Sequence, residues 1–196
     1  MDLVLFGIQG SGKGTQAKRL AAEFQYDIFE AGGELRKIAA SASAKATADK
    51  SGSELGKTVS SYIDKGHLVP HEIIMQVVKE AILARPKDQK ILFDGIPRDE
   101  NQMKDFDRVM KETGRDFRCI HILLTPDEGM QRILGRAKAE GRADDADTAI
   151  VARRMKTFTE KTMPVIEKYK NEGKMIEIDG MKSVDEVYGE MKRAVV

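Results

Sequence analysis

The sequence has one cysteine, no tryptophan and five prolines among 196 residues. A single cysteine excludes an internal disulfide, and no Cys/His cluster has the spacing of a zinc site. The 33 Lys plus Arg nearly cancel the 32 Asp plus Glu, leaving a formal net charge of +1. This balance argues against a protein that coats nucleic acid or an anionic membrane, but it leaves room for a small anion site.

Long apolar runs are also lacking. No run approaches the roughly 20 residues that a membrane helix needs. The first residues, MDLVLFGIQG, lack the basic start and cleavage site of a secretory signal. With only one cysteine, we therefore expect a protein of the reducing cytoplasm, without a membrane or nucleic-acid partner.

Short apolar runs recur along the chain and alternate with segments of helical periodicity. The runs are residues 3–6, 26–29, 91–93, 119–124 and 175–178. Between them, apolar residues recur every three or four positions, for example at Ala17, Leu20, Ala21 and Phe24. This alternation predicts an α/β protein with a doubly wound, five-stranded parallel sheet and helices on both faces. Ligands of such folds bind outside the carboxyl ends of the strands.

Two segments interrupt the alternation. Residues 30–69 are small and polar and rich in Ala and Ser, whereas residues 137–148 are charged and have no apolar face. We interpret both as insertions into a single core, which would then consist of residues 1–29, 70–136 and 149–196.

A glycine-rich loop lies between the first predicted strand and the first predicted helix. It reads Gly7-Ile-Gln-Gly10-Ser11-Gly12-Lys13-Gly14-Thr15. Glycines let backbone N–H groups converge on phosphate oxygens, and the start of the helix adds its positive dipole end. Lys13 then reaches the transferring phosphoryl oxygens. The pattern predicts a phosphate-binding loop, with Gly14 where a magnesium-binding Ser or Thr usually stands.

With this loop, the sequence resembles the adenylate kinases and related nucleoside monophosphate kinases. The match continues through Asp94-Gly95-Ile-Pro97-Arg98, Gly135-Arg136, Gly141-Arg142-Ala-Asp144-Asp145 and Arg153, and covers nearly the whole chain in the expected order. The resemblance implies a P-loop kinase fold that acts as a monomer. Residues 30–69 would form a helical monophosphate-binding insertion, and residues 137–148 a short lid. Because this lid has neither Cys nor His, zinc is not expected as a cofactor.

The resemblance also implies roles for individual residues. Arg36 and Arg98 would hold the monophosphate, Arg132 and Arg136 would face the triphosphate, and Arg142 and Arg153 would close over the transferring group. The implied catalytic residues are Lys13, Arg98, Arg132, Arg136, Arg142 and Arg153. The implied ATP-binding residues are Gly10, Ser11, Gly12, Lys13, Gly14, Thr15, Arg132, Arg136 and Lys182. The implied AMP-binding residues are Ala31, Gly32, Arg36, His67, Leu68, Val69, Gly95, Arg98, Gln102, Arg142 and Arg153.

Simpler interpretations stand beside these roles. Any of the arginines could be an ordinary surface ion pair. Asp94 ends an apolar strand, where its carboxylate could orient the waters of Mg²⁺ brought by ATP or could cap the following turn. No general base is needed, because the acceptor phosphate has a second pKa of about 6 and is largely dianionic at pH 7.

The choice of acceptor depends on two positions. Ala31 replaces a hydroxyl residue of the family's monophosphate segment and is more typical of pyrimidine relatives. Gln102 follows Arg98 as in adenylate kinases, and an amide can pair with the adenine edge; a helix-surface glutamine is the simpler interpretation. We favour transfer from ATP to AMP, giving two ADP. The alternatives are a UMP/CMP kinase or a nucleotide-binding regulator with weak transfer activity. A GTP-hydrolysing switch is disfavoured because the sequence has no Asn-Lys-x-Asp.

Overall fold

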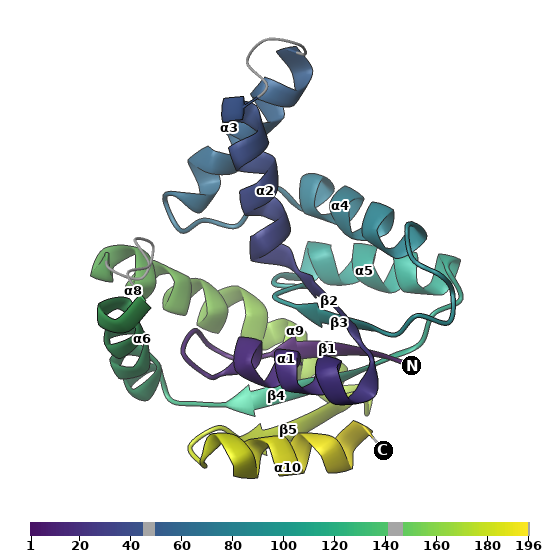
Figure 1. Ribbon diagram of the computed structural model, residues 1–196, viewed down its shortest axis with the longest axis vertical. Coiled ribbons are helices and arrows are strands. Elements are labelled where there is room, and N and C mark those ends of the chain that lie inside the picture. Colours follow the sequence, from purple (N-terminus) through teal and green to yellow (C-terminus); the bar gives the residue numbers. More distant parts are fainter. Residues whose placement is uncertain (45–49, 141–146, 196) are drawn as a thin grey trace.

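Figure 1 shows the computed structural model, which describes residues 1–44, 50–140 and 147–195. In these ranges, five parallel strands form one sheet in the order β2-β3-β1-β4-β5. The strands are β1 (Asp2–Phe6), β2 (Asp27–Glu30), β3 (Ile91–Asp94), β4 (Phe117–Leu123) and β5 (Met175–Asp179). All pairings between them are parallel. The predicted parallel sheet is confirmed, and each strand lies within about two residues of its apolar run.

Helices cover both faces of the sheet, as the doubly wound prediction requires. Leu3 and Leu5 of β1 pack against α1 (Lys13–Phe24) and α10 (Val184–Val195). Val4 and Phe6 face the opposite way, toward α4 (His71–Leu83), α5 (Glu100–Glu112) and α9 (Met163–Asn171). Every residue of β1 is buried, which is why this strand reads as a continuous apolar run rather than an alternating one.

The chain reverses its direction of winding at β1, which has β3 on one side and β4 on the other. In open α/β sheets, such a switch point creates a crevice at the carboxyl ends of the strands. The loop between β1 and α1 lies at this crevice. Ile8 of that loop packs against α6 (Pro126–Glu140) and α8 (Thr148–Thr157), and a π-helix, η1 (Phe158–Thr162), joins α8 to α9.

The two segments expected as insertions differ in how far the structure describes them. Within residues 30–69, α2 (Ala31–Ala44) and α3 (Lys50–Ile63) pack against each other and extend away from the sheet (Figure 1). Residues 137–140 continue α6, and the Asp147 carboxylate caps α8 by accepting the N–H of Ala149 at 2.8 Å. Residues 141–146, including Arg142, Asp144 and Asp145, lie outside the described residues.

A buried ion pair fixes the start of β1. The Arg115 side chain donates from Nε to Asp2 Oδ2 at 2.6 Å and from Nη2 to Asp2 Oδ1 at 2.8 Å. Asp2 Oδ1 also accepts the backbone N–H of Ile91 at 2.8 Å, so the carboxylate joins β1 to β3. Both side chains are largely buried, at 9% and 3% exposure.

None of the helices that the structure describes combines the length and the apolar character that a membrane span needs.

Candidate active site

A cavity of about 440 Å³ opens at the carboxyl ends of β1, β2 and β3. Most of the residues expected from the sequence to bind a nucleotide line it. These are Gly10, Gly12, Lys13, Gly14, Thr15, Ala31, Gly32, Arg36, His67, Leu68, Val69, Asp94, Gly95, Arg98 and Gln102. Ser11, in the same loop, is buried and is not among the lining residues.

The glycine-rich loop owes its shape to glycine at two positions. Gly12 adopts φ +87° as the residue preceding α1, and Gly10 adopts φ +84°. A Cβ on Gly10 would lie 2.6 Å from the carbonyl oxygen of Gly129 in α6, so the two backbones are in direct contact. The Lys13 ammonium folds over the loop and donates to Gly7 O at 2.5 Å and to Ile8 O at 3.2 Å. This places a positive charge at the start of α1, where an anion is favoured.

The turn after β3 presents Arg98 to the cavity. Arg98 Nε donates to Gly95 O at 2.7 Å, and a Cβ at position 95 would lie 2.6 Å from Arg98 Nη2. Gly95, with φ +83°, therefore lets the guanidinium fold back over the turn. Burial lowers the pKa of Arg98, Asp94 opposes this, and the positive charges of Arg154 and Arg36 lower it further. Arginine stays charged under these conditions, so the site holds cations that an anion would stabilise.

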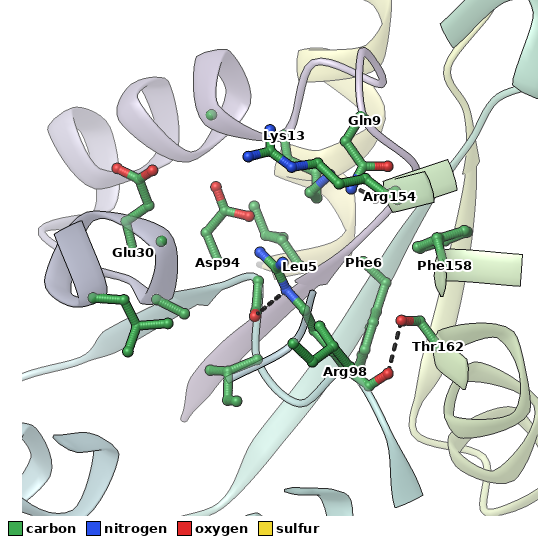
Figure 2. A pocket seen from close by; sticks show the side chains of 18 of the residues that line it. Leu5, Phe6, Gln9, Lys13, Glu30, Asp94, Arg98, Arg154, Phe158 and Thr162 are labelled. Carbon is green, nitrogen blue, oxygen red and sulfur yellow. Dashed lines mark hydrogen bonds between the residues drawn. The ribbon is translucent and has the colours of Figure 1, made fainter. Parts of the chain in front are cut away.

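The Asp94 carboxylate lies at the end of β3, in the same cavity (Figure 2). Burial raises its pKa, whereas the charges of Lys13 and Arg98 act in the opposite direction. Within the described residues, the Asp94 carboxylate accepts no hydrogen bond that would cap the turn after β3. A carboxylate beside a phosphate loop fits Mg²⁺ that arrives with ATP, because Mg²⁺ keeps several waters and takes its other ligands from phosphates.

The second turn of α2 brings a second arginine to the cavity. Arg36 Nη2 donates to Glu30 Oε1 at 2.9 Å, and Glu30 is the last residue of β2. A Cβ on Gly32 would lie 3.2 Å from Arg36 Nη1, so glycine leaves room for the guanidinium to lie over the helix start. Glu30 was not among the residues expected from the sequence. Its position at the end of a strand facing the predicted ligand side was the available signal.

Gln102 is not a helix-surface residue. It is 2% exposed, and its Oε1 accepts the backbone N–H of Arg98 at 2.8 Å. Asp99 caps α5 by accepting the Gln102 N–H at 2.9 Å. The amide is therefore fixed beside Arg98, with one lone pair of its oxygen engaged by the protein.

The structure brings Arg154 into the cavity rather than its neighbour Arg153. Arg154 lines the cavity, and Figure 2 shows its side chain extending from α8 toward Lys13. Arg153 is not among the lining residues; its Nη1 donates to Lys65 O at 2.9 Å and lies 3.4 Å from His67 Nε2. Val151 and Met155 are the buried residues of α8. Arg154 follows Val151 by three positions and so lies close to the buried side of the helix, where Arg153 does not.

The remaining expected residues lie elsewhere or outside the described side chains. Arg132 bonds Glu128 Oε1 at 2.8 Å and Gly180 O at 3.1 Å, and Lys182 pairs with Glu190; neither lines the cavity. Arg136 is part of α6, but its side chain is not described, and Arg142 lies outside the described residues.

The cavity carries an excess of positive charge. Among its described lining residues, five are Lys or Arg and two are acidic: Lys13, Lys18, Arg36, Arg98 and Arg154 against Glu30 and Asp94. Since the whole chain is nearly neutral, this excess is local. Cations converging on a phosphate loop offset the mutual repulsion of several phosphates held together.

Comparisons with known proteins agree with this geometry. Residues 5–174 match the family model described as adenylate kinase. The chain is similar to curated proteins named adenylate kinase from three bacteria. Identity is 33% for Phocaeicola vulgatus, over 100% of this chain and 98% of the relative. Identity is 34% for the Thermus thermophilus protein, over 98% of this chain and 96% of the relative. It is 36% for the Nautilia profundicola protein, over 98% of this chain and 94% of the relative.

Proposed function

The chain belongs to the adenylate kinase family, and from that premise we propose which of its residues carry the transfer of a phosphoryl group from ATP to AMP. It is a nucleoside monophosphate kinase, a phosphotransferase, with ATP and AMP as substrates and ADP as product. The observation that carries the assignment of residues is the cluster of cations around one cavity whose wall is the phosphate loop.

In this proposal, the donor and the acceptor enter from different walls. The loop from Gly10 to Thr15 binds the ATP phosphates through its backbone N–H groups and Lys13. Arg36 and Arg98 bind the AMP phosphate, since both line the wall formed by the ends of β2 and β3. Residues 67–69 and the Gln102 amide border the adenine, with the amide donating to a ring nitrogen.

Arg154 takes the role that the resemblance gave to Arg153. Its charge acts on Arg98, and in Figure 2 it extends toward Lys13, so its guanidinium lies between the donor and acceptor walls. A cation at this position stabilises charge on the phosphoryl group during in-line transfer. The chemistry otherwise consists of positioning, because the acceptor phosphate is already a nucleophile at neutral pH.

The family generally uses Mg²⁺ with ATP, and such an ion would supply positive charge that offsets the charge of the phosphates. We propose that Asp94 would hold this ion through its bound water. Action as a monomer, and roles for Arg132, Arg136 and Lys182 at the ATP, are parts of the proposal that rest on the family resemblance. A cytoplasmic location is a part that rests on the sequence composition.

Replacing each of the two neighbouring arginines of α8 in turn tests the assignment. We expect Arg154→Met to lower kcat for ADP formation by at least about 100-fold, because it removes a charge that acts on the transition state. Arg153→Met is the matched control, and it should keep kcat within about threefold, since the Arg153 side chain bonds a surface carbonyl. A loss confined to Arg153→Met would refute the assignment.

A further inference from the structure

Thr162 makes a hydrogen bond that a helical threonine does not ordinarily make. It is the last residue of η1, is 4% exposed, and its Oγ1 donates to the carbonyl oxygen of Arg98 at 2.8 Å (Figure 2). Threonine hydroxyls in helices usually bond back to their own helix. Thr159, in the same π-helix, does so by donating to Met155 O at 3.2 Å. The Thr162 hydroxyl therefore joins two segments that are 64 residues apart in the chain.

Arg98 is held on both sides of its own backbone. Its N–H donates to Gln102 Oε1 at 2.8 Å, and its C=O accepts from Thr162 at 2.8 Å. Its side chain bonds Gly95 O at 2.7 Å within the turn. These contacts fix the position and the direction of the guanidinium before any ligand binds, which lowers the entropy lost on gripping a phosphate.

The bond from Thr162 also links the segments that carry two of the arginines lining the cavity, Arg98 and Arg154. Arg154 lies in α8, which continues directly into η1 and then α9. Arg98 lies in the turn after β3. The two guanidinium groups are close enough for the charge of one to act on the other. A shift of η1 relative to the turn would therefore change the separation of these groups, and in-line transfer tolerates such a change poorly.

We propose that Thr162 is a positioning residue, whose hydroxyl sets the separation of Arg98 and Arg154 across the transferring phosphoryl group. This inference rests on the roles proposed above for the two arginines. A threonine whose hydroxyl only stabilised the fold would change the melting temperature without a selective effect on the AMP side of the reaction.

Thr162→Val tests the proposal, because valine keeps the shape and removes the hydroxyl. The Arg98 carbonyl then loses a buried hydrogen-bond partner, and a loss of this size corresponds to roughly a 10-fold change in an equilibrium or rate constant. We expect kcat/KM for AMP to fall about 10-fold, while KM for ATP stays within about twofold. Thr162→Ser, which keeps the hydroxyl, should recover most of the loss. Thr159→Val is the matched control and should behave like the wild type.

All variants are assayed for ADP formation at a temperature at which circular dichroism shows them folded. If Thr162→Val does not fold, Thr162→Ala and Thr162→Ser are compared instead, with the same expected contrast. The proposal is overturned if removing the hydroxyl leaves kcat/KM for AMP unchanged, if the KM for ATP rises equally, or if Ser does no better than Val or Ala. Wild-type protein that fails to phosphorylate AMP in the same assay would instead overturn the proposed function.

Discussion

The contact between the phosphate loop and α6 gives a sharp test of how closely the site is packed. Gly129 lies near the start of α6, against Gly10 and Gln9 of the loop. A Cβ at position 129 would lie 2.7 Å from Gln9 O, 3.3 Å from Met155 Cε and 3.4 Å from Ile8 Cγ2. The first of these atoms belongs to the backbone, so it cannot move unless the loop moves with it.

The size of the effect follows from that distance. Ordinary van der Waals contact begins at 3.4 Å, so Gly129→Ala requires the loop and the helix to separate by about 0.7 Å. Overpacking of this kind costs about 1–3 kcal/mol of stability, or roughly 2–12 °C in Tm for a chain of this length. A 1 Å misplacement costs on the order of 100-fold in rate, so we expect kcat to fall about 10- to 50-fold.

The assay is ADP formation under saturating ATP and AMP, together with thermal unfolding. Gly135→Ala is the matched control, because Gly135 lies in the same helix and a Cβ there meets no atom within 4 Å. Alanine at position 135 should leave kcat unchanged and raise stability by up to about 1 kcal/mol through helix propensity. Wild-type kcat and Tm in Gly129→Ala would refute the reasoning, as would equal damage in both variants.

Two further predictions concern stability. Asp2→Ala leaves the Arg115 guanidinium and the Ile91 N–H without their buried partner, and should cost about 3–5 kcal/mol in the free energy of unfolding; a loss below about 1 kcal/mol in denaturant titrations would contradict this. Burial lowers the pKa of His121 from 6.5 to about 4, so the folded state resists a proton that the unfolded state accepts. Stability should fall as the pH drops from about 6.5 to about 4, by about 3 kcal/mol from this residue. His121→Leu should flatten that slope, and an unchanged slope would count against burial as the cause.

The features that the sequence predicted best are those determined by local patterns. The apolar runs of β1 and β4 predicted buried strands because they alternate with segments of helical periodicity along the chain. The phosphate loop was equally clear, because glycines at positions 10 and 12 serve a conformation that other residues rarely adopt.

Side-chain direction was harder to predict, because it depends on packing between distant segments. Arg153 and Arg154 are neighbours, and only the burial of Val151 and Met155 decides which of them faces the cavity. From the sequence, Gln102 could have been a surface residue; the structure buries it and bonds its Oε1 to the Arg98 N–H. The Thr162 bond joins segments that no periodicity relates. Arg132 follows the family pattern in sequence, yet its guanidinium bonds Glu128 and the Gly180 carbonyl.

The most direct test of the account is the acceptor preference of the wild-type protein. Phosphorylation of AMP, UMP and CMP is measured at equal concentrations with ATP and Mg²⁺. We predict kcat/KM for AMP at least about 100-fold above that for either pyrimidine, because the smaller ring of UMP or CMP would leave the buried Gln102 amide without its partner on the base. Equal or greater rates with UMP or CMP would contradict the account.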